Sequence, residues 1–195
     1  MKKMLLVLSM IGLLASSAVA YPGPDSFGVY LETEFVGYPD TCVEAVFLDH
    51  VILWLMITDI SNTQVKAWEA LVTISNEAAW VGNWLLAGGS NYATPPQFVV
   101  GAGAAPLYPN VVNAVPLMSI DLLILDVTNP IEVFVAGVPG SLSFPYGPGY
   151  AWEAGFPVPC FTSTGGAATP VFRVNGDCLV SDEASSWGDV KTLYK

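Results

Sequence analysis

Several segments of the chain alternate apolar and polar residues with a period of two, and this pattern constrains the fold more than any other feature. Successive side chains of a β-strand point to opposite faces, so such alternation predicts strands that bury one face. The pattern occupies residues 27–35, 68–75 and 118–125. The run from Ala45 to Ile60 is apolar on both faces, and its content of valine, isoleucine and tryptophan favours a long central strand.

Turn signals separate these segments at regular intervals. The turn at 61–64 predicts an antiparallel hairpin between the long apolar strand and the strand at 68–75, and Thr128-Asn129-Pro130 predicts a second hairpin within 115–138. Further short strands are expected at 98–100, 158–162 and 170–174. About eight strands without a βαβ pattern indicate an all-β fold, an antiparallel β-sandwich.

The chain begins with the features of a cleavable export signal. Lys2 and Lys3 precede an apolar run from Met4 to Leu14, and Ala18-Val19-Ala20 is typical of a signal-peptidase site. The apolar run is too short for a retained membrane anchor, which takes about 20 apolar residues. We therefore expect residues 1–20 to be removed, leaving a secreted, periplasmic or envelope protein without a transmembrane anchor.

Removal of this signal would leave 175 residues, which is enough for one domain with its own core. We expect residues 21–185 to form the β-sandwich and residues 186–195 to form a short amphipathic helix that packs on it. Ser186 and Asp189 have the spacing of a capping box at the start of this helix. The apolar residues of the segment recur at helical spacing and are Trp187, Val190 and Tyr194.

The charge balance narrows the range of partners. Residues 21–195 contain 4 Lys and Arg against 17 Asp and Glu, a net charge of −13. Nucleic-acid binding relies on basic contacts to phosphate, so a nucleic-acid partner is excluded, and an anionic membrane surface is disfavoured. A protein or glycan partner outside the cytoplasm remains open. Disorder is not expected, because 53% of all residues are hydrophobic and only 12% are charged.

The chain offers few groups for catalysis. His50 is its only histidine, and we expect it to be a strand residue with local hydrogen bonds rather than the base of a triad or of a pair with Cys42. Paired carboxylates could serve a secreted glycoside hydrolase, but the alternation places most of them on solvent-facing sides of strands. The carboxylates considered are Glu32, Glu34, Asp49, Asp59, Glu69 and Asp121. The sequence therefore predicts that the protein is not an enzyme.

Three cysteines, Cys42, Cys160 and Cys178, would enter an oxidising compartment after export. Cys160 and Cys178 flank a predicted hairpin, so we expect a disulfide between them, with Cys42 left as a free thiol or an intermolecular link. The spacings fit no zinc motif, and no cofactor is expected. Calcium remains possible, because an acidic cluster near the C-terminus supplies oxygen ligands. The residues of this cluster are Asp177, Asp182 and Glu183, with Asp189 nearby.

Aromatic residues in irregular segments are candidates for stacking on sugars, because an aromatic ring offers a flat apolar surface. The candidates are Trp80, Trp84, Tyr146, Tyr150 and Trp152. Trp54 and Trp68 lie instead on predicted core strands. The spacing of Trp80 and Trp84 fits either a short helix or a strand. The alternative that the loop aromatics pack over the end of the sandwich stays open.

Three segments carry a family resemblance, and they are Gly28-Val29-Tyr30, Thr58-Asp59-Ile60-Ser61-Asn62, and Ala67-Trp68-Glu69 followed by Leu71-Val72-Thr73-Ile74. In this order they look like the cohesin-like and immunoglobulin-like sandwiches of secreted bacterial proteins. Residues 138–145 and 185–191 look like exported proteins of environmental bacteria to which no activity is assigned. Cohesin domains bind dockerin modules in extracellular scaffolds, so the resemblance implies a protein-binding module without assigning residues to the binding surface.

These observations together predict an exported, non-catalytic module with an interaction or structural role in the cell envelope or extracellular space. A carbohydrate-binding module that uses the loop aromatics is the alternative. A secreted glycoside hydrolase is the third hypothesis, and it would need two carboxylates in one cleft.

Overall fold

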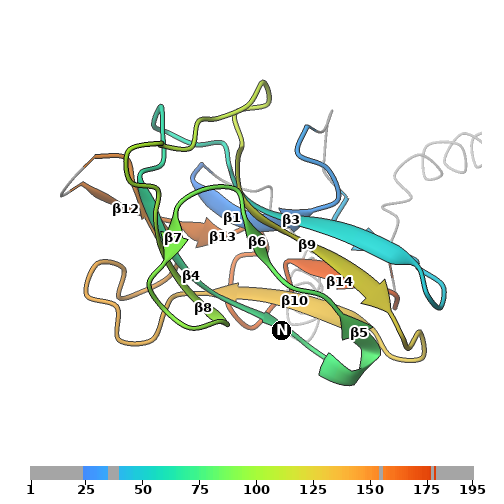
Figure 1. The fold of residues 1–195 in the computed structure, drawn as a ribbon. Coiled ribbons are helices and arrows are strands. Elements are labelled where there is room, and N and C mark those ends of the chain that lie inside the picture. The colour runs from blue at the N-terminus through green and yellow to red at the C-terminus, as the bar shows by residue number, and fades with distance from the viewer. Residues whose placement is uncertain (1–23, 35–39, 154–155, 177, 179–195) are drawn as a thin grey trace, which may run out of the picture.

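The computed structural model describes residues 24–34, 40–153, 156–176 and 178, and its strands form two sheets (Figure 1). The first, sheet A, has six strands. In spatial order they are β13 (Phe161–Thr162), β1 (Ser26–Tyr30), β3 (His50–Thr58), β9 (Val115–Ile124) and β5 (Trp80–Val81), with β6 (Leu85–Leu86) also paired to β9. All pairs in sheet A are antiparallel except β13 with β1.

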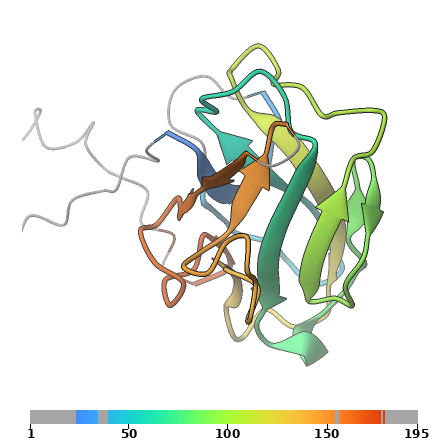
Figure 2. The ribbon, with the colours of Figure 1, turned by 90° about the vertical axis from the view of Figure 1, so that its left-hand side faces the viewer.

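The second sheet, sheet B, has eight strands. In spatial order they are β12 (Pro157–Pro159), β11 (Gly149–Ala151), β4 (Ala67–Ile74), β10 (Ile131–Ala136), β14 (Phe172–Val174) and β2 (Cys42–Val43), while β8 (Gln97–Gly101) pairs with β4, and β7 (Ser90–Asn91) with β8. Figure 2 shows β8 and β11 on opposite sides of β4. The 3₁₀ turn η2 (Glu77–Ala79) precedes β5, and the described residues include no α-helix. The predicted all-β class is confirmed.

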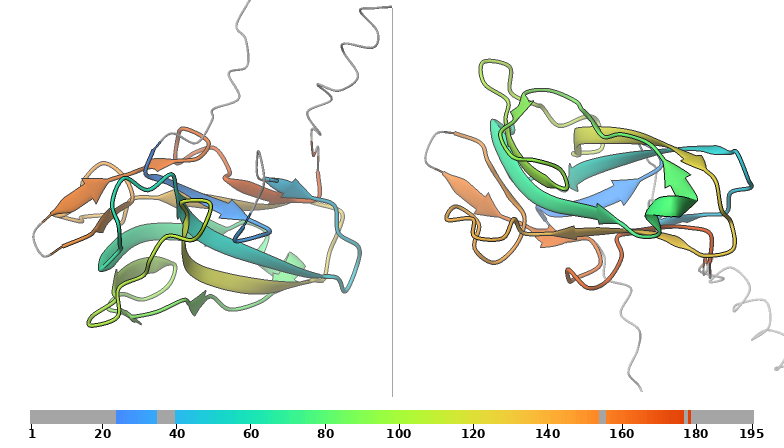
Figure 3. Two further views of the ribbon diagram at one scale, coloured as in Figure 1. Left: turned by 90° about the horizontal axis from the view of Figure 1, so that it is seen from above. Right: turned by 60° about the horizontal axis from the view of Figure 1, so that its bottom comes forward.

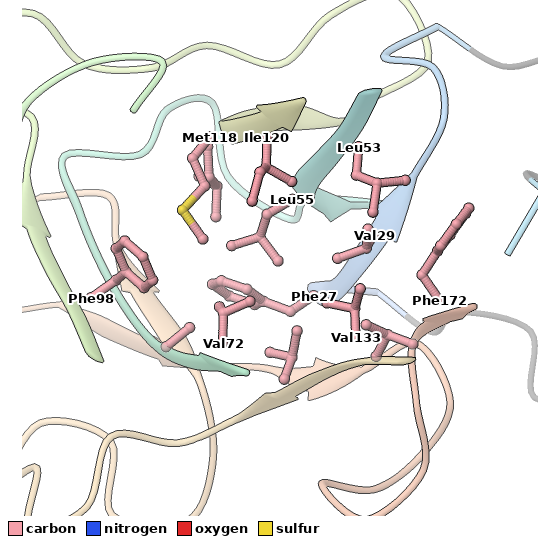
Figure 4. Packing of buried hydrophobic residues seen from close by; sticks show 14 of the residues in the cluster. Phe27, Val29, Leu53, Leu55, Val72, Phe98, Met118, Ile120, Val133 and Phe172 are labelled. Carbon is pink, nitrogen blue, oxygen red and sulfur yellow. The ribbon is translucent and has the colours of Figure 1, made fainter. Parts of the chain in front are cut away.

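One hydrophobic core lies between the inner faces of the two sheets. Figure 3 shows β3 and β9 on one side of the molecule and β10 and β14 on the other. Alternate residues of the strands enter the core, as the period of two predicts, and Figure 4 shows how they interdigitate. The side chains labelled there are Phe27, Val29, Leu53, Leu55, Val72, Phe98, Met118, Ile120, Val133 and Phe172.

Both predicted hairpins are wrong, because each turn carries the chain from one sheet to the other. β3 pairs with β1 and β9 in sheet A, whereas β4 pairs with β8, β10 and β11 in sheet B. Likewise β9 belongs to sheet A and β10 to sheet B. Asp59 directly after β3 has a left-handed backbone (φ 55) that bends the chain away from its own sheet. Strands joined in this way bury their inner faces against each other, which alternation alone does not distinguish from a hairpin.

The first strand is buried on both faces, although the alternation predicts that Tyr30 is exposed. Its ring lies over Gly28 of the same strand, where a Cβ would collide with the ring. Tyr30, Met56 and Ala114 form a small second cluster on the outer side of sheet A, with Trp54 and Val112 packed against it. The glycine therefore allows an aromatic ring to cover this part of the outer face.

The predicted Cys160–Cys178 disulfide is wrong: Cys178 is bonded to Cys42, which is 136 residues away in the sequence, with a Cα–Cα distance of 5.4 Å. The expected hairpin around residues 163–169 does not form, because β13 joins β1 in sheet A and β14 joins β10 in sheet B. The parallel pairing of β14 with β2 brings the end of the described chain to Cys42. Cys160 is left as a buried free thiol.

Several predictions fall outside the described residues. They concern the export signal at 1–20, the helix at 186–195, and the calcium candidates Asp177, Asp182 and Glu183. Within the part of the chain that the structure describes, no helix is long and apolar enough to cross a membrane.

Candidate functional site

The single histidine makes an exposed hydrogen bond to an aspartate, the His50–Asp121 pair, on the outer face of sheet A. His50 Nδ1 lies 2.9 Å from Asp121 Oδ1, with side chains 63% and 54% exposed. An exposed pair of this kind contributes at most about 1 kcal/mol to stability. The thiol considered as its nucleophile, Cys42, is consumed by the disulfide. The pair therefore lacks the nucleophile that the Cys–His hypothesis requires.

The carboxylates considered for glycoside hydrolysis are mostly on the surface. Glu69 is half-buried on β4, where Ser141 Oγ donates a hydrogen bond of 2.6 Å to its Oε2. The other five are exposed, and they are Glu32, Glu34, Asp49, Asp59 and Asp121. Among the described residues, no group of three or more histidine, cysteine, aspartate or glutamate side chains is placed to hold a metal ion.

The outer face of sheet A around the His50–Asp121 pair is aliphatic. Strand register places its side chains in three rows: His50 with Leu123 and Val81, Ile52 with Asp121, and Trp54 with Ser119 and Leu85. Residues directly opposite in register share a face of the sheet. Ile52, Val81 and Leu85 are 51%, 57% and 68% exposed. The His50–Asp121 pair is thus surrounded by exposed apolar side chains.

Three further apolar side chains, Val46, Phe47 and Leu48, extend this surface at the turn before β3, and all are more than half exposed. The turn lies beside the end of β9, because Leu48 N donates a hydrogen bond of 2.8 Å to Ile124 O. We call Val46, Phe47, Leu48, Ile52, Val81 and Leu85 the apolar face of sheet A.

The backbone of this turn is strained in a way that keeps an apolar side chain exposed. Leu48 has φ 69, in the left-handed region, which costs about 1 kcal/mol for a residue with a Cβ. Asp49 closes the turn, since Val46 N donates 2.8 Å to Asp49 Oδ2. Backbone strain of this kind is more frequent in functional segments than elsewhere. The Leu48 side chain is 54% exposed, so packing in the core does not explain why a leucine occupies this strained position.

The outward residues of β3 differ in how the described chain covers them. Met56 is fully buried beneath Tyr30 and Ala114, and Trp54 is half-buried against the same cluster. Ile52, the next outward residue, is half exposed. The cover therefore ends midway along the strand, and the apolar face of sheet A begins there.

A second apolar surface lies against sheet B. β10 and β11 pair with the same edge of β4, one after the other along that strand. The chain that connects them leaves the sheet at Gly137 and returns at Gly147. These two residues are so close that a Cβ on Gly137 would lie 2.7 Å from the Gly147 carbonyl oxygen. Residues 137–147 therefore form an Ω-loop. Phe144 of this loop is buried over Gly149.

The Ω-loop walls a groove of about 320 Å³. The groove is mainly apolar, and Glu69 is the one carboxylate among its lining residues, which are Ala67, Trp68, Glu69, Val99, Val100, Ser143, Phe144, Ala151, Phe156 and Pro157. Trp152 lies beside it, with its ring centroid 6.0 Å from that of Phe156. Phe144 and Phe156, which line the groove, were not among the sequence candidates, since nothing in their Pro-flanked segments distinguishes them from other loop aromatics.

The predicted aromatic candidates do not form one platform. Tyr150 is fully buried, so its assignment to glycan stacking is wrong. Trp80 and Trp84 are half-buried and pack against the core from the side of sheet A, where Trp80 Nε1 donates to Ser75 O at 3.0 Å. Tyr146 is fully exposed on the Ω-loop. Of the five, Tyr146 and Trp152 belong to the segments around the groove.

Tyr150 belongs instead to a buried polar network that sequence analysis missed. Its hydroxyl donates to Asp25 Oδ1 at 2.7 Å and accepts from Asn62 Nδ2 at 2.8 Å. Asp25, only 8% exposed, also accepts from the amide and hydroxyl of Ser61, at 2.9 and 2.5 Å. Burial raises the pKa of Tyr150; Asn62 opposes this shift and Asp25 reinforces it. The network joins the start of β1 to the turn after β3 and to β11.

Cys160 lies close to this network. Burial raises the pKa of its thiol well above the usual value, and the negative charge of Asp25 raises it further. Because the thiolate is the reactive form, Cys160 is an inert core residue at neutral pH.

Comparison with solved structures shows a weak similarity to a cohesin module. The sixth cohesin of scaffoldin B from Acetivibrio cellulolyticus, solved in complex with a dockerin mutant, aligns with a TM-score of 0.40 and 14% identity, over 78% of this chain and 99% of that one. No family model matches the chain, and no curated protein has a matching sequence. At this TM-score the similarity establishes neither a family nor a binding partner.

The cysteine chemistry gives a direct prediction. In folded, unreduced protein, Cys160 should react with iodoacetamide on the order of 100-fold more slowly than in denaturant, because the thiol is buried and protonated. Peptide mass mapping after labelling in denaturant should find the label on Cys160 alone. Label on Cys42 would instead establish the Cys160–Cys178 pairing, and fast labelling of the folded protein would contradict the burial.

Proposed function

We propose that the chain is an exported, non-catalytic module that binds a protein partner through the apolar face of sheet A. In this proposal residues 1–20 direct export, and the two sheets form a β-sandwich of the cohesin-like or immunoglobulin-like kind. The observation that carries the proposal is that the aliphatic side chains around His50 and Asp121 remain exposed while the adjoining part of the same sheet face is covered.

Burial of apolar surface would favour the binding of a partner to this face. Soluble proteins rarely expose contiguous apolar patches without using them. Ile52, Val81 and Leu85 are each about half exposed, so covering them would contribute on the order of 1 kcal/mol apiece. The exposed turn at Val46–Leu48 would add a comparable amount. Such a surface suits specific, reversible binding.

The charges around the face indicate the chemistry of the partner. Asp49 ends the exposed turn, Asp121 lies within the face, and Asp126 follows β9, where its amide donates to Ala79 O next to β5. Hydrogen bonds from Thr128 hold the pKa of Asp126 below its usual value, so this carboxylate is ionised at neutral pH. A complementary partner would carry an apolar patch with basic side chains at its rim.

A photo-cross-linking amino acid at position 81 tests this proposal. Introduced in place of Val81, benzoylphenylalanine should give a discrete protein adduct in the native host, and Ile52→Asp or Leu85→Asp in the same chain should lower its yield at least fivefold. The matched control is the same amino acid in place of Leu142, which is 98% exposed on the Ω-loop. Equal adducts at both positions, or no adduct at position 81, would count against the proposal.

A carbohydrate-binding module is the second candidate, and the groove on sheet B favours it. An exposed aromatic ring beside a hydrogen-bonding carboxylate, here Phe156 and Glu69, suits the apolar face and the hydroxyls of a sugar. Tyr146 and Trp152 extend the aromatic surface near the groove. Hydrolysis of a glycan would require two carboxyl groups about 5–10 Å apart across a cleft. Glu69 is the one carboxylate among the residues that line this groove.

Affinity electrophoresis of residues 21–195 through gels containing soluble polysaccharides tests this second candidate. If the groove binds a glycan, migration is retarded in one of the gels, and Phe156→Ala abolishes the retardation while Phe161→Ala, at an exposed ring outside the groove, leaves it unchanged. The absence of retardation across the panel would remove the glycan candidate.

A further inference from the structure

The described chain ends at the β14–β2 edge of sheet B, close in sequence to the turn that extends the apolar face of sheet A. Cys178 is bonded to Cys42, and Cys42 precedes the exposed turn at Val46–Leu48 by only four residues. The two segments run together, because Asn175 N donates to Val43 O at 2.8 Å and Asn175 Oδ1 accepts from Ala45 N at 2.7 Å. The chain that follows Cys178 is therefore tethered covalently to the segment that leads into the exposed turn of this face.

The remaining chain is long enough to cross the face. Residues 179–195 number 17, and the eight residues from 179 to 186 could extend for about 26 Å. The connection must pass from sheet B to sheet A, which packed sheets place about 10 Å away, and then cross β3, β9 and the short strands β5 and β6, about another 10 Å at normal strand spacing. The segment 186–195 can thus lie over Ile52, Val81 and Leu85 without strain in the connection.

The chemistry of that segment complements the face. If residues 186–195 form the helix that their spacing predicts, Trp187, Val190 and Tyr194 share one side of it, in a stripe that matches an aliphatic surface. Lys191 and Lys195 are two of the four cations that follow residue 20. Asp121 lies within the face, and Asp49 and Asp126 lie at its border, so basic side chains beside an apolar stripe complement its charges.

We propose that residues 186–195 bind the apolar face of sheet A within the same molecule, with Trp187, Val190 and Tyr194 against Ile52, Val81 and Leu85. The inference deepens the proposed function, on which it rests for the identity of the face. A partner that binds there must displace the segment. The partner would then bind the full chain more weakly than a chain without the segment, and the difference in binding free energy equals the free energy with which the segment is held on the face.

Photo-cross-linking from the C-terminal segment tests its contact with the apolar face of sheet A. Benzoylphenylalanine in place of Trp187, in purified residues 21–195, should form intramolecular cross-links to peptides that contain Ile52, Val81 or Leu85. Val81→Asp should lower their yield at least fivefold, whereas Leu142→Asp on the Ω-loop should not change it. Raising the salt concentration from 0.05 to 0.5 M should lower the yield, because the lysine–aspartate attraction is screened. An unchanged thermal midpoint verifies that Val81→Asp remains folded.

A second measurement does not depend on any substitution in the face. Removal of residues 179–195 should increase the fluorescence of an apolar dye bound to the protein at least threefold, since the face is then uncovered. Cross-links confined to other surfaces, cross-links between two chains, or equal dye binding with and without the segment would each overturn the inference. Because this experiment uses the purified chain alone, it can fail while the partner adduct at position 81 is still found, and the reverse also holds.

Discussion

The packing of Trp68 between the two sheets is the contact on which the rest of the structure depends. Its ring is fully buried, stacks on Phe98 of the same sheet at 6.0 Å, and meets Phe27 of the opposite sheet at 6.4 Å. Trp68 lies in β4, the strand that holds β8, β10 and β11 together. Once the inward residues of β4 and β1 are fixed in this way, the period of two assigns every other residue of these strands to an outer face. Both candidate surfaces are consequences of that assignment.

The outer faces then differ because the chain covers them unequally. β3 is apolar on both sides, so half of its large side chains must lie on the outer face of sheet A. Tyr30 and Ala114 cover Met56, but the described chain leaves Ile52 exposed. The buried Asp25 network and the Cys42–Cys178 disulfide act at the edges, where they fix the start of β1 and the end of β14. A disulfide that closes so long a loop stabilises the fold by up to about 5 kcal/mol in the chain-entropy model, and it also sets where the C-terminal segment begins.

Sequence analysis predicts the features that depend on local pattern. The strands near residues 27, 68, 98 and 118 and the all-β class follow from alternation, and the structure confirms them. Pairing between distant strands does not follow, because alternation reports only that a strand has a buried face. Both hairpins and the Cys160–Cys178 disulfide were wrong for this reason. Tyr150 has the sequence context of a loop aromatic, and only the folded chain brings Asp25 and Asn62 to its hydroxyl. The apolar face combines residues from four separate segments, which no motif unites.

We infer that the apolar face of sheet A is maintained for binding and contributes little to folding. The free energy of unfolding of Leu48→Asn, measured by urea denaturation in the chain that ends at Cys178, tests this claim most directly. Asparagine tolerates the left-handed backbone better than leucine, and an exposed leucine has little packing to lose. We expect the variant to be at least as stable as the parent chain, with a gain of up to about 1 kcal/mol. A loss of about 2 kcal/mol or more would show that Leu48 packs as a structural residue, and would contradict the account.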